Sequence, residues 1–245
     1  TTTYGTGQML RAILESGVRN VIVGIGGSAT VDGGAGMAQA LGYRLLDDSR
    51  GEIPRGGRGL ERVRSIDGEG VMQELRDSHI RVACDVTNPL TGDEGAARVY
   101  GPQKGADSEM VEELEKGLVN LFAVWRKESM LTDQEPGDGA AGGLGAGMRA
   151  FCGARLESGA KLMTEAVGLA NHLRGADLLI TGEGRTDEQT AHGKLCAVLA
   201  DAARTSGVPT LLLAGALQGE LDPLLDTFTY ALSISAGHNS LNGSI

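Results

Sequence analysis

Three short runs of apolar residues each end in a segment of glycine and polar residues. The runs and the segments that follow them are residues 21–23 with 24–36, 80–84 with 85–90, and 178–181 with 182–191. Apolar residues at helical spacing return beyond the first and third of these segments. Strands that alternate with helices in this way predict an α/β fold with a largely parallel sheet.

Glycine supplies 39 of the 245 residues, about twice its ordinary share. Low-complexity disorder would bring proline-rich and repetitive sequence, but this chain has only six prolines and 41% hydrophobic residues. We therefore expect the glycines to lie in tight loops that another group approaches closely. Two further glycine clusters, at 101–105 and 139–147, are also expected to be loops.

The longest predicted helix begins after Asp107. Asp107 or Ser108 can cap its first turn, and an apolar stripe along it is expected to lie in the core. The stripe consists of Met110, Val111, Leu114, Leu118, Leu121, Phe122 and Trp125. Other expected elements are helices at 8–16, 37–41, 162–173 and 193–206, strands at 43–46 and 210–213, and a polar loop at 47–59.

Charge and hydropathy exclude two classes of partner. The 22 basic and 32 acidic residues give a net charge of −10, so nothing suggests the basic face that binds nucleic acid. Apolar stretches are short and interrupted by glycine, so no membrane span is expected and we predict a cytoplasmic protein. The sequence opens at Thr1 without a leader or an initiator Met, which suggests a processed chain or a missing beginning.

The three cysteines give no sign of a disulfide framework or a zinc site. Cys84, Cys152 and Cys196 lie far apart, and none belongs to a CxxC pair. We expect reduced thiols that pack among apolar residues.

Segment 182–194 carries the residues most suggestive of chemistry. Directly after a predicted strand it combines glycines with Glu183, Arg185, Asp187, Gln189, His192 and Lys194. Phosphoryl transfer needs cations on the transferred group, carboxylates for magnesium and a group that orients the attacking hydroxyl. Arg185 and Lys194 suit the first task, and Glu183 and Asp187 suit the others. The alternative is a solvated charged loop.

Two other loops follow predicted strands, where ligands bind in open parallel sheets. The first contains Ser28 and Asp32, and the second contains Asp85, Thr87 and Asn88. We expect these polar residues to line a cleft.

Two nucleotide-binding motifs were tested against the sequence. The P-loop pattern fails around Lys194, because Leu195 stands where Ser or Thr is required. Gly24, Gly26 and Ala29 satisfy a dinucleotide pattern, and Asp47 follows at a suitable spacing. Glycines at 33 and 34 disfavour the helix that this pattern needs, yet an NAD-dependent oxidoreductase stays an alternative.

Five blocks, taken in order, resemble the signature blocks of the bacterial glycerate kinase family. They are residues 24–37, 84–90, 101–106, 139–145 and 180–185. The resemblance extends from Thr1 to about Ser235. It implies ATP- and Mg²⁺-dependent phosphorylation of D-glycerate to 2-phosphoglycerate. Departures from the family pattern occur at Gln8, Val31, Asp138 and Thr186.

The resemblance also implies two α/β domains. One is a Rossmann-type, flavodoxin-like domain with a parallel sheet built from both chain ends, and the other is inserted within it. Residues 1–175 would be mostly the inserted domain, and 176–245 the returning part of the Rossmann-type domain. Segments typical of both ends of the family are missing from the sequence, so the chain looks truncated. Exposed strand edges would then favour a homo-oligomer, and a non-catalytic module is the alternative to an enzyme.

The implied site residues fall into three groups. Asp187, Lys194 and Arg185 are the expected catalytic residues, with Asp187 and Glu183 as metal ligands. The expected glycerate-binding residues are Ser28, Asp32, Asp85, Thr87, Asn88 and Lys104. The expected ATP-binding residues are Gly182, Glu183, Gly184, Gln189 and His192.

Overall fold

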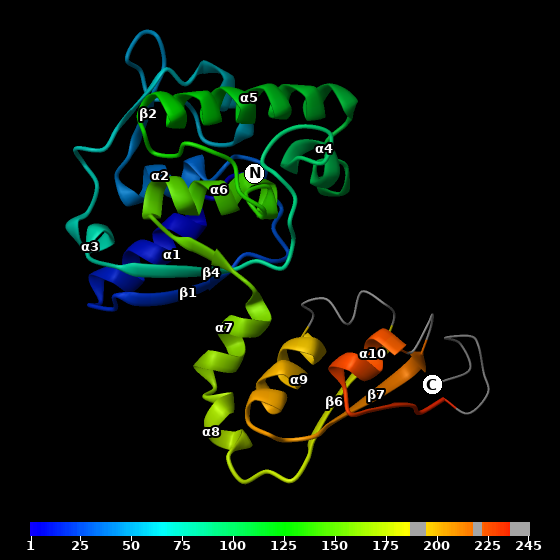
Figure 1. The fold of residues 1–245 in the computed structure, drawn as a ribbon. Helices are drawn as coiled ribbons and strands as arrows, with labels where there is room; N and C mark the ends of the chain where they lie inside the picture. The colour runs from blue at the N-terminus through cyan, green and yellow to red at the C-terminus, as the bar shows by residue number, and fades with distance from the viewer. Residues whose placement is uncertain (187–194, 218–221, 236–245) are drawn as a thin grey trace. The chain divides into compact units, whose positions relative to one another are not determined.

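The structure is a computed structural model of the chain, and it describes residues 1–186, 195–217 and 222–235 (Figure 1). The chain divides into two compact units, Thr1–Glu157 (unit 1) and Ser158–Ile245 (unit 2). The sequence placed the change of domain near residue 175. Which part of the family fold each unit forms stays a prediction, as does association between copies of the chain.

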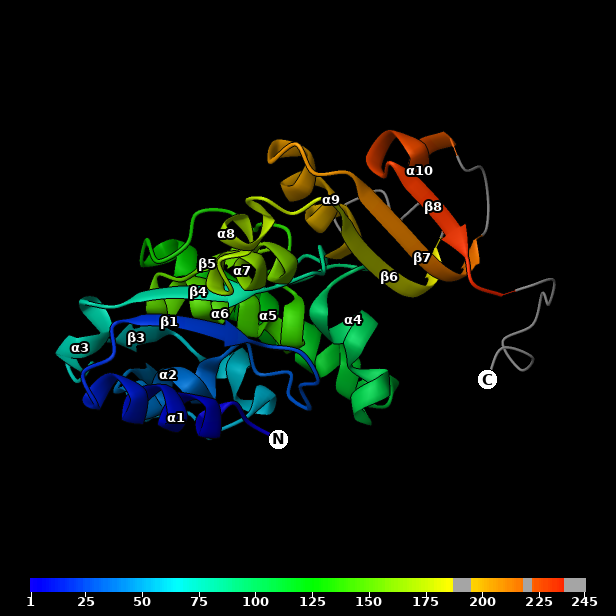
Figure 2. The same cartoon turned by 90° about the horizontal axis from the view of Figure 1, so that it is seen from below.

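Unit 1 is built on a parallel three-stranded sheet. Its strands are β1 (Asn20–Gly24), β4 (His79–Ala83) and β5 (Arg155–Glu157), in the order β1-β4-β5. Figure 2 shows β1 and β4 side by side, and Val21 is paired with Ile80 in the ladder. The predicted parallel α/β architecture is confirmed here.

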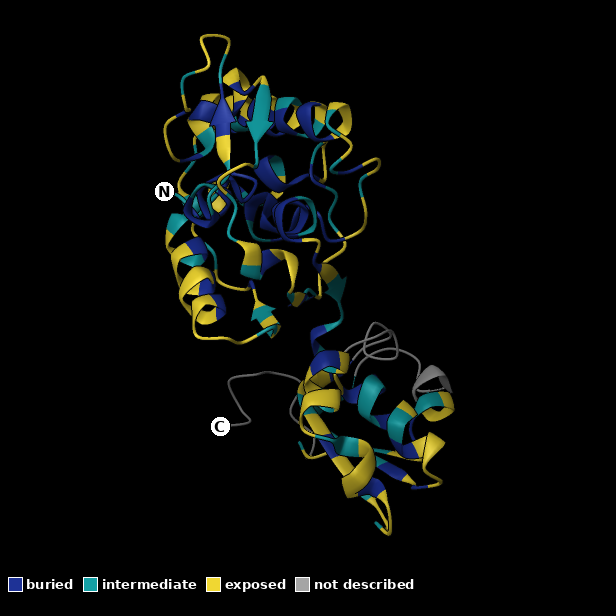
Figure 3. Cartoon of the chain, turned by 90° about the vertical axis from the view of Figure 1, so that its left-hand side faces the viewer, coloured by how far each residue is buried: buried dark blue, intermediate teal, exposed yellow. Residues whose placement is uncertain are grey.

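Alternating side chains decide which face of this sheet is covered. Val82 is fully buried, whereas Ile22, which points to the opposite face, is 44% exposed. The covered face packs on a core that includes residues of α1 (Tyr4–Glu15) and α2 (Ala35–Leu41). Figure 3 shows buried residues concentrated in the interior of unit 1. The helices therefore bury one face of the sheet within this unit.

The predicted long helix is α5 (Ser108–Lys127). Asp107 caps it, because its carboxylate accepts a hydrogen bond from the Met110 N–H at 2.9 Å. Trp125 is fully buried, and its ring meets the edge of Phe151 at a centroid distance of 5.5 Å. The stripe is core as predicted, except for Met110, which is 40% exposed.

The structure of residues 139–147 differs from the prediction. They were expected to form a loop, but most belong to α6 (Ala140–Cys152), whose first turn is kinked at residues 141–143. A Cβ atom on Gly147 would overlap the carbonyl oxygen of Gly33. Glycine disfavours helix by about 1 kcal/mol relative to alanine, but here it lets α6 pack directly on another backbone. Close packing outweighs the helix propensity.

The rest of unit 1 consists of short elements. β2 (Arg44–Leu46) and β3 (Ser65–Asp67) form a separate antiparallel pair. The predicted loop at 47–59 ends in a 3-10 helix, η1, which begins at Gly57. The remaining elements are α3 (Gln73–Arg76), α4 (Ala96–Tyr100) and η2 (Pro102–Lys104), with η1 spanning Gly57–Arg62.

Unit 2 contains a second parallel sheet, in the order β6-β7-β8. Its elements are α7 (Gly159–Ala166), α8 (Leu169–Leu173), β6 (Leu179–Thr186), α9 (Leu195–Thr205), β7 (Thr210–Leu217), α10 (Asp222–Thr227) and β8 (Tyr230–Ser233). The single helix predicted at 162–173 is wrong. Gly168 adopts a left-handed conformation with φ +65° and separates α7 from α8.

Strand β6 corrects a further prediction. The loop expected from residue 182 onward begins later, because β6 continues to Thr186. Pairing with β7 carries the ladder on, with Gly182 opposite Leu213 and Arg185 opposite Ala216. A Cβ atom on Gly182 would lie 2.6 Å from the Leu213 oxygen, so this glycine permits a close approach between strands. None of the described helices is both long and apolar enough to span a membrane.

We expect unit 1 to lose stability as the pH rises above about 9, because Cys152 lies in its core. Burial raises the pKa of this thiol from 9.0 to about 12. A group whose folded pKa is raised stabilises the fold fully below its unfolded pKa, and that contribution is lost as the pH rises toward the folded pKa. The Cys152 contribution to the free energy of unfolding should therefore fall by up to about 1.4 kcal/mol for each unit of pH between these values.

Denaturant unfolding at pH values from about 8 to 11 measures this effect. Cys152→Ala should be less stable at neutral pH but should have a flatter dependence on pH. Equal slopes for the two proteins would contradict the prediction.

Candidate active site

A cavity of about 460 Å³ lies in unit 1 at the carboxyl ends of β1 and β4. It is lined by residues 24–28, 83–86, 100, 103–104 and 140–141. We call it the strand-end cavity. It brings together four of the five sequence blocks that resemble the family, although these blocks are far apart along the chain. Ser28, Asp85 and Lys104 line it, and their expected role in binding glycerate stays a prediction.

Lys104 joins two of these blocks. Its Nζ atom donates hydrogen bonds to Ser28 Oγ at 2.9 Å and to the Thr30 carbonyl oxygen at 2.8 Å. The same ammonium lies 5.9 Å from the centroid of the Tyr100 ring. Burial lowers the pKa of Lys104, and the nearby Asp32 carboxylate opposes that shift. A cation is therefore held in position at the cavity.

Tyr100 was missed by the sequence analysis. Its hydroxyl donates to Asn88 Oδ1 at 2.6 Å, and Asn88 Nδ2 in turn donates to the Glu94 carbonyl oxygen at 2.9 Å. Burial raises the pKa of Tyr100, with a smaller contribution from Cys84. Asn88 therefore braces the loop after β4 against α4. The only signal in the sequence was the position of Tyr100 directly before the block at 101–106.

Cys84 was also missed as a candidate site residue. It was expected to be a reduced thiol packed among apolar residues, but it is only half-buried and lines the strand-end cavity. Its Sγ lies 3.3 Å from the Val86 carbonyl oxygen. Burial raises its pKa, so the thiol is favoured over the thiolate. Cys152 and Cys196 are buried, as predicted.

Asp32 occupies a different place from the one expected. It is 1% exposed and does not line the strand-end cavity. One carboxylate oxygen accepts hydrogen bonds from the Thr3 N–H at 2.7 Å and the Thr3 hydroxyl at 3.0 Å. The other accepts from the Gly34 N–H at 3.2 Å. Asp32 therefore ties the start of α1 to the first glycine loop. Thr87 is exposed and also lies outside the cavity lining.

The site residues predicted in unit 2 are only partly described. Gly182, Glu183, Gly184 and Arg185 belong to β6. Glu183 Oε1 accepts a hydrogen bond from the Thr186 hydroxyl at 3.0 Å. The predicted residues Asp187, Gln189, His192 and Lys194 lie outside the described residues. The roles expected for all eight stay predictions.

Mg²⁺ binds to oxygen ligands, so a magnesium site needs carboxylate or other oxygen-bearing side chains. Within the described ranges, no three His, Cys, Asp or Glu side chains gather into a group that can hold a metal ion. Mg²⁺ bound beside a nucleotide commonly uses one or two protein carboxylates together with phosphate oxygens. Glu183 fits that kind of site as a single carboxylate, and the magnesium assignment stays a prediction.

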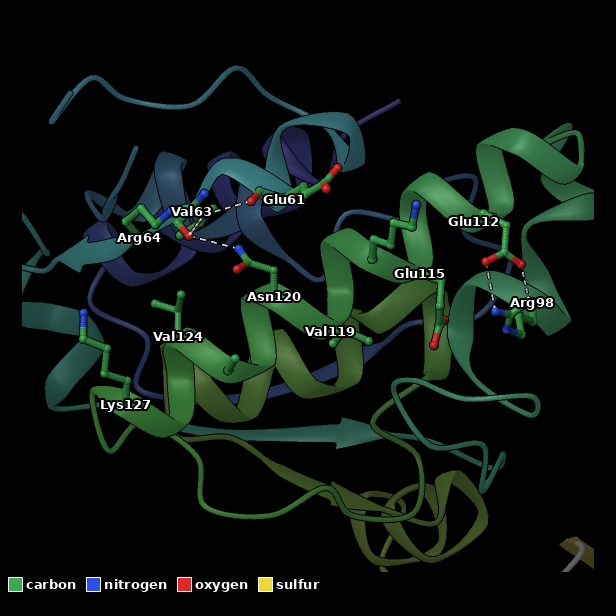
Figure 4. Close-up of a pocket in the computed structure, with 12 residues that line it drawn as sticks. Glu61, Val63, Arg64, Arg98, Glu112, Glu115, Val119, Asn120, Val124 and Lys127 are labelled. Carbon is green, nitrogen blue, oxygen red and sulfur yellow. Dashed lines mark hydrogen bonds and ion pairs between the residues drawn. The ribbon is translucent and has the colours of Figure 1, made fainter. Parts of the chain in front are cut away.

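A larger hollow of about 750 Å³ runs along α5 (Figure 4). Arg98 and Glu112 form a two-pronged ion pair there at 2.5 and 3.1 Å. Asn120 donates hydrogen bonds to the backbone oxygens of Leu60 and Val63 at 2.8 and 3.0 Å. No residue predicted from the sequence lines this hollow. We therefore place the candidate site in the strand-end cavity.

The geometry disfavours the dinucleotide alternative. A dinucleotide fold opens a helix directly after the first strand, but α2 begins only at Ala35, well beyond the end of β1 at Gly24. Asp47 follows β2, which lies in another sheet. Its carboxylate accepts hydrogen bonds within its own turn, from the Ser49 hydroxyl at 2.7 Å and the Gly51 N–H at 3.0 Å.

Comparison with known proteins supports the family suggested by the sequence blocks. The sequence model of the glycerate kinase family matches residues 1–245. The glycerate 2-kinase of Escherichia coli strain K12 is 48% identical over 222 residues, which cover 90% of this chain and 58% of that protein. The glycerate kinase of Bacillus subtilis strain 168 is 48% identical over 219 residues, with coverage of 89% and 57%.

A solved structure shows the same fold. The crystal structure of a glycerate kinase 2 from Salmonella typhimurium LT2 matches 100% of this chain and 64% of its own chain, with a TM-score of 0.83 and 45% identity. The chain thus spans roughly three fifths of the length of these relatives. The family's sequence model, the relatives and the solved structure all agree, and we conclude that this chain belongs to the glycerate kinase family.

Proposed function

We propose that this protein transfers the γ-phosphoryl group of ATP to a hydroxyl of D-glycerate and forms 2-phosphoglycerate. The observation that carries the proposal is the strand-end cavity, where four separate sequence blocks of a glycerate kinase family chain converge. The carboxyl ends of parallel strands are the usual ligand sites of open α/β sheets. The cavity volume of about 460 Å³ suits a small hydroxy acid.

In this proposal, unit 1 binds the acceptor. Lys104 supplies a positive charge, Ser28 and Asp85 supply polar groups, and Tyr100 and Asn88 hold the loop after β4. A carboxylate such as Asp85 can accept a hydrogen bond from an acceptor hydroxyl. Fixed polar groups orient a small acceptor and hold its hydroxyl for attack, which is the main contribution that a protein makes to phosphoryl transfer.

The segment that begins in β6 is proposed to serve the nucleotide. A Cβ atom on Gly184 would meet no heavy atom within 4 Å, so this glycine leaves the backbone open to phosphate oxygens. Gly182, Gln189 and His192 are further proposed ATP-binding residues. Arg185 and Lys194 would offset the negative charge of the phosphates, with Glu183 and Asp187 as Mg²⁺ ligands. When bound, Mg²⁺ neutralises charge on the β- and γ-phosphate oxygens. Alternatively, Asp187 acts as the base for the acceptor hydroxyl instead of binding the metal.

Release of ADP in the presence of D-glycerate tests the function directly. The full chain, ATP and MgCl₂ should release ADP only when glycerate is added, and phosphorus NMR should show a new phosphate monoester. Glycerol in place of glycerate should give no release above background. ADP release that ignores the acceptor would point to simple ATP hydrolysis and would contradict the proposal.

A matched pair of lysine variants tests the nucleotide segment. Lys194→Ala should lower kcat by about tenfold or more, because an ammonium on the transferred phosphoryl group stabilises the transition state. Lys161→Ala, at an exposed position in α7, should keep the original rate. Equal rates for all three proteins would place the phosphate cation elsewhere.

Calorimetry, read together with the ADP-release assay, distinguishes an enzyme from a binding module. The module alternative arises because the chain covers about three fifths of its relatives. A module would bind glycerate or ATP with Mg²⁺ but would give no product. Binding of glycerate and ATP together with formation of product supports the kinase proposal.

A further inference from the structure

The turn after β1 presents backbone donors that no protein group uses. Among the described residues, the N–H groups of Gly26, Gly27 and Ser28 donate to no acceptor. Gly26 and Gly27 are exposed, and Gly27 has a left-handed conformation with φ +69°. A Cβ atom at either glycine would meet no heavy atom within 4 Å. The turn thus combines unused donors with open space at the cavity wall.

Lys104 holds its ammonium beside the same turn. An ammonium has three N–H donors, and two of those on Lys104 are used by Ser28 Oγ at 2.9 Å and the Thr30 oxygen at 2.8 Å. Within the described ranges the third has no acceptor, so it can bind a ligand. Among the residues that the structure describes, the charged side chains that line the strand-end cavity are Asp85 and Lys104. The part of its wall around Lys104 and the turn therefore favours an anion.

Successive backbone N–H groups at a turn with one left-handed residue form a concave site for anions. A nearby ammonium strengthens such a site, because hydrogen bonds between charged groups are the strong ones. Both features occur here within one wall of the cavity, on residues 26–28 and Lys104.

We propose that the N–H groups of Gly26, Gly27 and Ser28, together with Lys104 Nζ, form the receptor for the carboxylate of the acceptor, so that the site selects small hydroxy acids over neutral polyols. This inference rests on the proposed function. A phosphate group could accept hydrogen bonds from the same N–H groups and the same ammonium. One ammonium and three amide N–H groups can balance the single negative charge of a carboxylate. A triphosphate carries more negative charge than this set of donors can balance.

Tyr100 is a positioning residue of this receptor. Its ring lies below the ammonium at 5.9 Å, and its hydroxyl bonds to Asn88 at 2.6 Å. At this distance the ring can attract the ammonium, and the hydrogen bond to Asn88 holds the ring in place.

The first test removes the cation. Lys104→Met should raise the KM for D-glycerate about tenfold to a hundredfold, since the loss of a hydrogen bond to a charged group weakens binding by about that factor. The KM for ATP should stay within about twofold. Lys116→Met, at an exposed lysine of α5, is the control and should change neither value. A raised KM for ATP with an unchanged KM for glycerate would mean that the anion is phosphate, and it would overturn the carboxylate assignment.

The second test fills the turn without disturbing the fold. Gly26 has no left-handed φ, and the Cβ atom of Gly26→Ala would point into open space. This variant should keep its unfolding midpoint but raise the KM for glycerate, because the methyl group hinders approach to the N–H groups. Gly5→Ala in α1 also places its Cβ atom in open space and serves as the control. An unchanged KM for Gly26→Ala would contradict a receptor at this turn.

Equilibrium binding separates this inference from the proposed function. If the full chain shows no turnover, glycerate and inorganic phosphate are titrated into it by calorimetry. Glycerate binding that Lys104→Met weakens would support the receptor even though the kinase proposal had failed. No binding of glycerate, or equal binding by both proteins, would overturn the receptor.

Discussion

Replacing Arg149 by Met is expected to lower the free energy of unfolding of unit 1 by about 3–5 kcal/mol. The side chain of Asp138 is 0% exposed and that of Arg149 is 13% exposed. Arg149 Nη1 donates to the two carboxylate oxygens of Asp138 at 2.8 and 2.7 Å. Asp138 also accepts a hydrogen bond from the Glu135 N–H at 2.7 Å. Without Arg149, a buried carboxylate would lose the partner of its charge.

The sole tryptophan makes this prediction measurable. Trp125 lies fully buried in unit 1, so its fluorescence during urea denaturation reports the unfolding of that unit. Arg98→Met is the matched control, because Arg98 pairs with Glu112 at the surface, where their side chains are 34% and 52% exposed. Surface pairs contribute about 0–1 kcal/mol. If Arg149→Met cost no more than Arg98→Met, the buried pair would not stabilise the unit as argued.

Replacing Gly142 by Ala is expected to destabilise unit 1 by about 2–5 kcal/mol. Gly142 has φ +72°, a conformation that costs a residue with a Cβ atom about 1–2 kcal/mol. The new Cβ atom would also overlap the carbonyl oxygen of Thr30 and lie 2.8 Å from the Cα atom of Val31. Overpacking of this kind costs about 1–3 kcal/mol more. Thr30 is an acceptor for Lys104, so the change should disturb the strand-end cavity as well.

Gly153 supplies the control for this second prediction. It ends the same helix with φ +61°, but its Cβ atom would meet nothing within 4 Å. Gly153→Ala should therefore show the backbone cost alone, about 1–2 kcal/mol. The difference between the two variants in urea denaturation measures the steric overlap. Equal losses of stability would mean that the Thr30 loop moves aside at no cost.

Local sequence was sufficient to predict the elements that make their own contacts. The apolar stripe of α5 has the period of a helix, and Asp107 bonds to an N–H only three residues away. The strands β1 and β4 contain short, mainly apolar runs, and segments of glycine and polar residues follow them. These signals lie within a few residues of the structure that they specify, so no knowledge of the rest of the chain was needed.

Three of the expected glycerate-binding residues lie together in the structure, and their role stays a prediction. Ser28, Asp85 and Lys104 line the strand-end cavity, because loops at the ends of parallel strands meet at one edge of a sheet. Asp32 belongs to the same loop as Ser28, but its carboxylate turns inward to Thr3. No local sequence pattern predicts the hydrogen bonds between Asp32 and Thr3, since these residues are brought together by the packing of α1 against the loop.

The sequence by itself determined the parallel α/β class, the principal helix and strands, and the family. Only the tertiary structure decided that Gly145 and Gly147 lie in a helix, that β6 extends to Thr186, and that Tyr100 and Cys84 face a cavity. The physical reason is the range of the interactions. Helix periodicity and capping act between residues a few positions apart, whereas the contact of Gly147 with Gly33 and the β6–β7 ladder join distant segments. Such contacts outweigh local propensity only after the chain has folded.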